Sequence, residues 1–156
     1  MDSQIIYGLA QEFRGLVEVA LRDGLETKCH IDEHFPNACC EDASVLLATF
    51  LADNGFDGSL LVYGVHGGVN EELRTHVWLL LNGLHIDITG SQFSKHGYDQ
   101  PEVYVAKKCD FLESFHVEKA PRQADFRVKY SEKSDWLYWF ESTYRKIISK
   151  RTNPAQ

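Results

Sequence analysis

Three residues of the types used in thiol catalysis occur in the order Cys40, His76 and Asp87. Cys40 precedes a series of apolar residues with helical spacing that stops at Asn54, which predicts a helix from Cys40 to about Asn54. The thiol is therefore expected at a helix start, where unpaired backbone N–H groups and the positive end of the helix dipole stabilise a thiolate and a developing oxyanion. A thiol in that setting is suited to attack a carbonyl carbon.

The histidine and the aspartate are expected on the two strands of one hairpin. The β-prone residues 75–81 and 84–89 flank Asn82-Gly83, the strongest short signal for a tight turn. A two-residue turn fixes the register and makes His76 and Asp87 diagonal neighbours, roughly 7–8 Å apart at the backbone, so that a carboxylate can hold an imidazole. The predicted pairs are Leu81 with Leu84, Leu80 with His85, Leu79 with Ile86, Trp78 with Asp87 and His76 with Thr89.

The same register gives the hairpin two faces. The apolar face, expected to be core, carries Val77, Leu79, Leu81, Leu84, Ile86 and Ile88. The opposite face carries His76, Trp78, Leu80, His85, Asp87 and Thr89. If the helix that begins at Cys40 packs against this second face, the three side chains form a nucleophile, a base and a group that orients the base.

Length and composition favour a single domain over residues 1–156, because the chain is 44% hydrophobic and long enough to bury a core. A net charge of −7 with scattered basic residues argues against a nucleic-acid partner. Neither a signal sequence nor a membrane-spanning stretch is recognisable, so we expect a cytoplasmic protein with no membrane partner. Four cysteines, two of them adjacent, are poor material for a disulfide framework and are expected to be reduced.

The remaining pattern predicts two or three helices around an antiparallel sheet, which is an α+β domain. An amphipathic helix is expected at residues 4–21, and a helix capped by Ser134 is expected to run to Ile148. The other predicted segments are a strand at 59–65, a surface loop at 91–100 and strand candidates at 103–106, 114–117 and 126–130.

These residues resemble the transglutaminase-like branch of the papain-like cysteine enzymes. In that family a helix-starting segment G-x-C-x-[DE]-x-[AS] with later apolar residues precedes a strand bearing H-[AV]-W and a strand bearing [LI]-D-x-T. The corresponding segments here are Ala38-Cys39-Cys40-Glu41-Asp42-Ala43-Ser44, His76-Val77-Trp78 and Ile86-Asp87-Ile88-Thr89, within about residues 36–93. The resemblance implies a papain-like fold, with the nucleophile helix packed on an antiparallel sheet, and a Cys-His-Asp triad.

The resemblance also distinguishes the two adjacent cysteines. Taking Cys40 as the nucleophile places Leu46, Leu47, Phe50 and Leu51 at the family's apolar positions, whereas Cys39 would place Val45 and Thr49 there. The chain departs from the family pattern at Ala38, where a glycine is usual. That departure removes no reactive group.

Other residues near this set could assist the reaction. The backbone N–H of Cys40 is the natural oxyanion donor, and the amide of Asn37 or Gln92 could be a second donor, although each could equally cap a loop. Trp78 is interpreted as a packing wall in preference to a substrate contact, and His85 as an exposed residue.

The predicted function is thiol-dependent acyl transfer from a peptide, a protein side-chain amide or a small acyl substrate, with no cofactor. Water as acceptor would give a peptidase, amidase or deamidase, and an amine would give a transferase. One alternative is a zinc site, since Cys29, His30, His34, Cys39 and Cys40 lie within twelve residues, but no Cys-x-x-Cys pair is present and no bound metal is expected. The other is an inactive protein-interaction module on the same fold.

Overall fold

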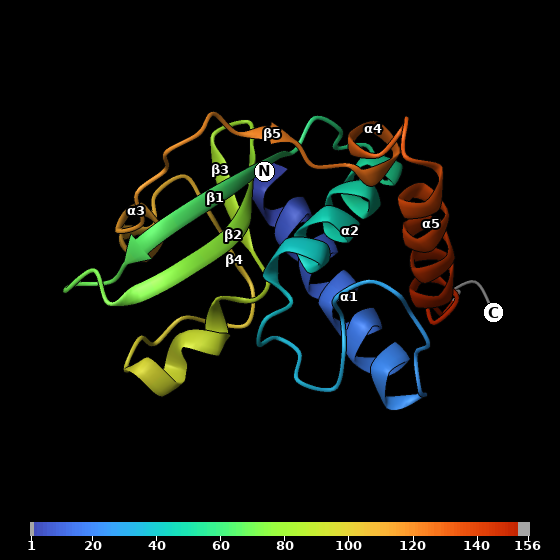
Figure 1. The fold of residues 1–156 in the computed structure, drawn as a ribbon, viewed down its shortest axis with the longest axis horizontal. Coiled ribbons are helices and arrows are strands. Elements are labelled where there is room, and N and C mark those ends of the chain that lie inside the picture. Colours follow the sequence, from blue (N-terminus) through green and yellow to red (C-terminus); the bar gives the residue numbers. More distant parts are fainter. Residues whose placement is uncertain (1, 153–156) are drawn as a thin grey trace.

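The structure, a computed structural model, describes residues 2–152 and combines helices with one antiparallel sheet (Figure 1). This confirms the α+β class. The helices are α1 (Asp2–Arg22), α2 (Cys40–Asp53), α3 (Asp110–Glu113), α4 (Phe126–Lys129), α5 (Ser134–Ile148) and the 3-10 helix η1 (Gly90–His96). The strands are β1 (Leu60–Gly67), β2 (Leu73–Leu81), β3 (Leu84–Asp87), β4 (Tyr104–Ala106) and β5 (Arg122–Gln123), in the sheet order β4-β3-β2-β1-β5.

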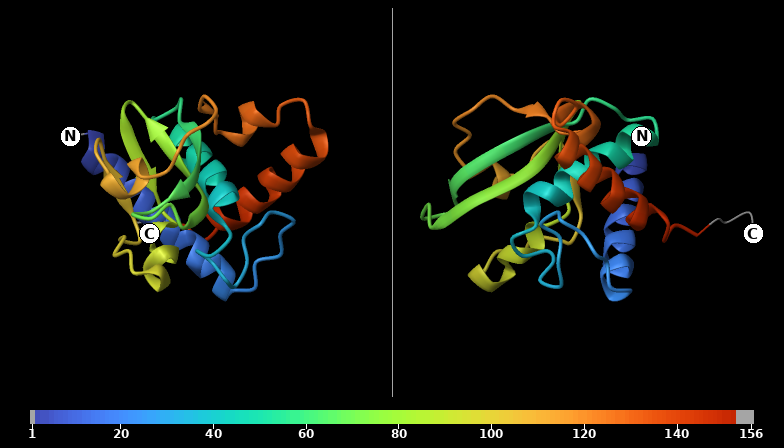
Figure 2. Two further views of the ribbon diagram at one scale, coloured as in Figure 1. Left: turned by 60° about the vertical axis from the view of Figure 1, so that its left-hand side comes forward. Right: turned by 45° about the vertical axis from the view of Figure 1, so that its right-hand side comes forward.

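The three long helices lie on one side of the sheet, and the β1–β2 hairpin projects beyond them (Figure 2). Helix α1 is amphipathic, as predicted, and buries one apolar stripe against α2 and α5. Arg14 on the same side of α1 donates to the backbone carbonyls of Ile88 and Glu102, which ties α1 to both ends of the segment that joins β3 to β4. Within residues 2–152 no helix has both the length and the apolar character needed to cross a bilayer.

Helix α2 begins at Cys40, as predicted, and ends at Asp53. Its residues from Asp42 to Leu51 are all buried, because the helix is apolar on nearly every side. The helix packs on the apolar face of the sheet, in one core cluster with Val77 and Leu79. The condition considered above, that α2 packs against the His76 face, is therefore not met by the helix body, because the larger apolar surface lies on the other face.

The central hairpin has the predicted register, with Leu81 opposite Leu84, Leu80 opposite His85 and Leu79 opposite Ile86. Its turn residues Asn82 and Gly83 both have positive φ, 50° and 79°, as a tight type I′ turn requires. The turn chemistry thus sets which side chains share a face.

The face that carries His76 is also buried, beneath a second and smaller core. This aromatic cluster contains Val62, Leu73, Trp78, Phe93, Cys109, Phe111, Leu112 and Phe115. Phe93 in η1, Phe111 in α3 and Phe115 just after α3 belong to this cluster. The segment after β3 therefore folds back over the sheet. Both faces of the sheet are consequently buried around His76, Val77 and Trp78.

Four local predictions need correction. Residues 126–130 form a helical turn, because the Asp125 side chain accepts a hydrogen bond from the Arg127 backbone N–H and starts a helix. Residues 114–117 make one isolated bridge, between Val65 and His116, and no strand. The expected loop at 91–100 contains η1, which ends at Gly97 with φ 87°. Ser134 opens α5 without capping it.

The close packing of the aromatic cluster on β1 yields a stability prediction. Gly64 lies opposite His76, and a Cβ there would stand 2.6 Å from Phe115 Cβ and 2.8 Å from Trp78 Cζ3. Gly64→Ala should therefore lower the free energy of unfolding by about 1–3 kcal/mol in urea denaturation. The control is Gly15→Ala, at an open, exposed position inside α1, which should raise stability by up to about 1 kcal/mol. Equal effects at both sites would contradict this packing.

Candidate active site

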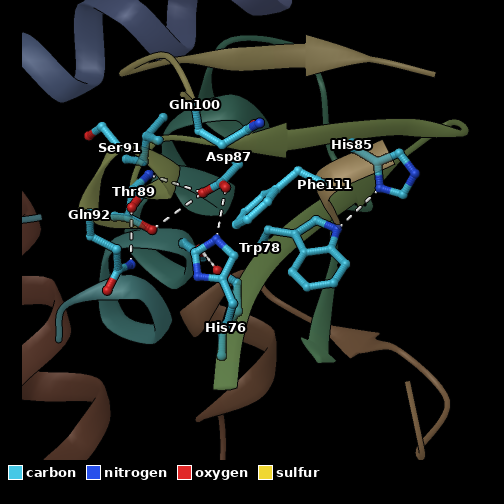
Figure 3. A network of polar contacts seen from close by, with 12 residues as sticks. His76, Trp78, His85, Asp87, Thr89, Ser91, Gln92, Gln100 and Phe111 are labelled. Atoms are coloured by element: carbon cyan, nitrogen blue, oxygen red, sulfur yellow. Dashed lines mark hydrogen bonds and ion pairs between the residues drawn. The ribbon is translucent and has the colours of Figure 1, made fainter. Parts of the chain in front are cut away.

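The contact expected from the hairpin register is present. Nε2 of His76 lies 2.8 Å from Oδ2 of Asp87, and the two side chains are 0% and 2% exposed (Figure 3). A charge-assisted hydrogen bond of this length in a dry site is stronger than its neutral equivalent. Asp87 therefore fixes the orientation of the imidazole and uses one of its two nitrogens.

The Asp87 carboxylate is itself held in place by the start of the next segment. Its Oδ1 accepts hydrogen bonds from the backbone N–H of Thr89 at 3.0 Å and from the Thr89 hydroxyl at 3.3 Å. Gly90 leaves the necessary space, since a Cβ there would stand 2.7 Å from Asp87 Oδ2. Thr89 was predicted only as part of the Asp-x-Thr pattern and as the strand partner of His76, and Gly90 had no predicted role, although the Asp-x-Thr spacing is typical of a side chain that caps its own turn.

Aromatic rings enclose the His76 imidazole. Trp78 stacks on it with a centroid distance of 5.7 Å and an interplanar angle of 27°, and Phe93 meets it edge-on at 5.0 Å. Phe115 completes the wall at 5.8 Å. Among the described residues, Nδ1 of His76 is buried and has no hydrogen-bond partner. A buried imidazole nitrogen that is left open in this way calls for a partner during function.

Burial by itself would lower the pKa of His76, because it disfavours the charged imidazolium. The charge and hydrogen bond of Asp87 act in the opposite direction, and the Cys40 side chain adds to their effect. Together they raise the pKa of His76 from its ordinary value of 6.5 to about 9. His76 is therefore mainly an imidazolium at neutral pH, the state that stabilises a neighbouring thiolate.

Cys40 is the first residue of α2, and its side chain is partly exposed. The preceding Cys39 occupies the N-cap position and makes no side-chain cap hydrogen bond, so the first N–H groups of the helix are not covered by that side chain. Ala38 has φ 59°, in the left-handed region that glycine adopts without strain. An alanine therefore holds a left-handed backbone position just before the two cysteines.

Three contacts fix the start of α2 between the sheet and the preceding loop. Asp42 Oδ2 accepts a hydrogen bond of 2.7 Å from the backbone N–H of His30. The hydroxyl of Tyr63 donates to Glu41 Oε2 at 3.0 Å. Ser44, one helical turn after Cys40, donates a long hydrogen bond of 3.5 Å to the carbonyl of Val77, the neighbour of His76. The helix start is therefore anchored beside the strand that carries the histidine.

The other residues considered for the site make structural contacts around Cys40, His76 and Asp87. The Gln92 amide donates to the Thr89 carbonyl at 3.0 Å and stabilises the start of η1 (Figure 3). Asn37 lies in the loop before Cys40, where its backbone carbonyl faces the Cys39 thiol at 3.2 Å. Trp78 is buried, and its Nε1–H donates to Nδ1 of His85 at 3.1 Å. His85 is half-buried, so the expectation that it would be exposed is wrong.

The alternative zinc ligands do not gather. Within residues 2–152 no three His, Cys, Asp or Glu side chains are arranged to hold a metal ion. Cys29 Sγ points to the Thr143 hydroxyl at 3.5 Å, and Cys39 Sγ to the Asn37 carbonyl. Burial raises the pKa of Cys29, Cys39 and Cys109, whose thiols are consequently poor nucleophiles.

Comparisons with known proteins assign no relative: no family model matches the chain, and neither a curated protein nor a solved structure matches it significantly. The geometry of the site therefore carries the functional assignment proposed below.

The left-handed backbone at Ala38 predicts an order of tolerance at that position. Glycine relieves a strain of about 1 kcal/mol but adds unfolded-chain entropy of similar size, so Ala38→Gly should change stability by less than about 0.5 kcal/mol. Ala38→Val should cost more than about 1 kcal/mol, because a β-branched side chain is poorly accommodated at positive φ. Urea denaturation of both variants measures the difference, and equal tolerance of valine and glycine would exclude this backbone conformation.

The raised pKa of His76 predicts a pH dependence of stability. The folded state binds the proton more tightly than the unfolded state, so the stabilisation is complete below about pH 6.5 and is lost as the pH rises towards about 9. At about 1.4 kcal/mol per pKa unit the loss is at most about 3.5 kcal/mol. Denaturation of wild type and Asp87→Asn across this range isolates the effect, because the variant should lack most of this fall. Parallel curves for the two proteins would refute the pairing.

Proposed function

We propose that this protein is a thiol-dependent acyl-transfer enzyme in which Cys40 is the nucleophile, His76 the proton carrier and Asp87 the residue that orients His76. The observation that carries the proposal is the buried imidazole of His76. One of its nitrogens is fixed by Asp87, the other is open, and its pKa is shifted by the Cys40 side chain. A histidine with a purely structural role would normally have both nitrogens satisfied.

In the proposed reaction the proton of the Cys40 thiol already resides on the open nitrogen, Nδ1, so that the resting site holds a thiolate and an imidazolium. The sulfur then forms a bond to the carbonyl carbon of an amide or acyl substrate, and the carbonyl electron pair moves onto oxygen. As the tetrahedral intermediate collapses, the bond to the leaving group breaks and His76 returns its proton to that group. Water or an amine then attacks the thioester, with His76 taking its proton, and releases Cys40.

The start of α2 supplies the stabilisation that the oxyanion needs. The backbone N–H of Cys40 belongs to the first turn, where the partial positive charge of the helix is concentrated. Such a donor acts most strongly on charge that develops in the transition state. This places the oxyanion next to the thiol without requiring a side-chain donor, since the Gln92 amide already binds the Thr89 carbonyl.

We further propose that the domain is a member of the transglutaminase-like branch of the papain-like enzymes. The support is the arrangement of a nucleophile at a helix start, a histidine on the second strand of an antiparallel sheet and an aspartate on the third. The substrate class that fits this chemistry is a peptide, a protein side-chain amide or a small acyl compound.

The test is the pH profile of Cys40 alkylation by iodoacetamide, followed by mass mapping, in wild type, His76→Ala and Asp87→Asn. The wild-type rate should stay on a plateau at mildly acidic pH, because the imidazolium stabilises the thiolate. The plateau should disappear in His76→Ala and shrink in Asp87→Asn, and turnover of an acyl substrate should fall by orders of magnitude in Asp87→Asn.

Labelling of Cys40 in preference to the other cysteines is not the test. Cys29, Cys39 and Cys109 are buried, so selective labelling of Cys40 would follow from accessibility alone and decides nothing. The shape of the profile is decisive. Three superimposable curves that rise only above about pH 8, as for an ordinary thiol, would refute the catalytic assignment and leave an inactive interaction module.

A further inference from the structure

A pocket of about 420 Å³ opens on the sheet face that α2 covers. Tyr63 and Val65 on β1 form its apolar wall, and Tyr63 packs against the core cluster to which α2 belongs. The segment that joins α3 to β5 passes beside β1 and supplies the opposite wall (Figure 1). A volume of this size is sufficient for a substrate side chain or a small ligand.

The lining of the pocket is linked to the first turn of α2 by a hydrogen bond. Tyr63, which lines it, donates a hydrogen bond to Glu41, the residue after Cys40. On the other side, the charge of Lys129 acts on Asp42, two residues after Cys40, and lowers its pKa against the larger effect of burial. One residue from each wall, Tyr63 and Lys129, therefore interacts with the helical turn that presents the thiol.

The pocket is positively charged, although the protein as a whole is acidic. Lys119, Arg122 and Lys129 line it, against one carboxylate, Glu118. In the chain from residue 2 to residue 152, none of these three cations takes part in a salt bridge. Three free cations around one pocket, in a chain with net charge −7, are an arrangement that attracts an anion.

Two of the cations are held in place by the fold. The backbone of Arg122 pairs with Leu61 at the edge of the sheet, which fixes where its side chain begins. Lys129 is half-buried, and its Nζ lies 5.6 Å from the centroid of the Tyr130 ring. This cation–π contact restricts the position of its charge. A positioned cation loses less entropy on binding an anion than a freely rotating one does.

We propose that this pocket is an anion subsite for the acyl portion of the substrate, so that the enzyme acts on acyl groups that carry a carboxylate close to the reactive carbonyl. This inference rests on the proposed thiol chemistry of Cys40. The acyl portion is chosen because its carbonyl oxygen must face the first turn of α2, to which Tyr63 of the pocket lining is hydrogen-bonded through Glu41. Acidic peptide segments, such as those containing glutamate, have this chemistry.

The experiment compares dipeptidyl chloromethyl ketones that differ only in carrying Glu or Gln, placed first or second from the reactive carbon. The Cys40 thiolate displaces chloride, so a carbon–sulfur bond forms as the carbon–chlorine bond breaks. Rates are normalised to those of N-acetylcysteine amide. For at least one placement, the wild-type protein should react about tenfold faster with the Glu probe, the ratio that one charge-assisted hydrogen bond supplies.

The variants separate the pocket from the His76 imidazolium, which attracts anions by itself. Arg122→Gln and Lys129→Gln should each reduce the Glu-to-Gln ratio about threefold or more, where the ratio compares the two probe rates of the same variant. Lys107→Gln, an exposed position beyond β4 at the opposite edge of the sheet, removes the same charge and should leave the ratio intact.

The outcomes distinguish the two proposals. Rapid alkylation of Cys40 by both probes, with no preference for Glu or with a preference that Arg122→Gln and Lys129→Gln leave unaltered, overturns the anion subsite and leaves the thiol enzyme intact. If neither probe alkylates Cys40 faster than it alkylates N-acetylcysteine amide, the proposed function is overturned, and the subsite with it.

Discussion

An almost completely buried charged pair, His76 with Asp87, sets the requirements that the surrounding structure meets. Removing an imidazolium and a carboxylate from water is costly unless each has close partners. Asp87 meets this requirement with three hydrogen bonds, to His76 and to the backbone and hydroxyl of Thr89. Because the sheet holds both strands in register, the pair needs no movement to form.

The two cores on either side of the sheet have different tasks. The larger one joins α1, α2 and α5 to the sheet and supplies most of the buried apolar surface, and hence most of the stabilisation. The smaller aromatic cluster contributes less area but excludes water from His76. Low local polarity strengthens the interaction between His76 and Asp87, so the smaller core tunes the site more than it stabilises the fold.

The parts of the site that could be predicted from sequence were those set by short-range chemistry. Asn82-Gly83 determines the hairpin register, which in turn brings His76 and Asp87 onto one face. The apolar spacing after Cys40 likewise locates the beginning of α2 at the correct residue. Both features depend on a few neighbouring residues, and tertiary contacts did not override them.

The remaining features depend on contacts between distant segments. Residues 126–130 look like a strand because they contain Phe126, Val128 and Tyr130, but the cap from Asp125 and the contact with α5 favour a helical turn. The sequence could not predict which face of the sheet α2 covers, because the helix is apolar on nearly every side. The basic pocket unites β1, β5 and α4, which no local pattern connects.

The His76–Asp87 contact spans eleven residues, whereas the link from α2 to the histidine strand, between Ser44 and Val77, spans thirty-three. Closing the shorter loop costs less entropy, and a hairpin forms within microseconds, so the imidazole and carboxylate can meet before the helix docks. On the proposed function, the thiol gains its partner only when the larger core is complete. A nascent or partly unfolded chain would then carry an ordinary cysteine, and the fold itself would keep the reactive sulfur from appearing before there is a site to control it.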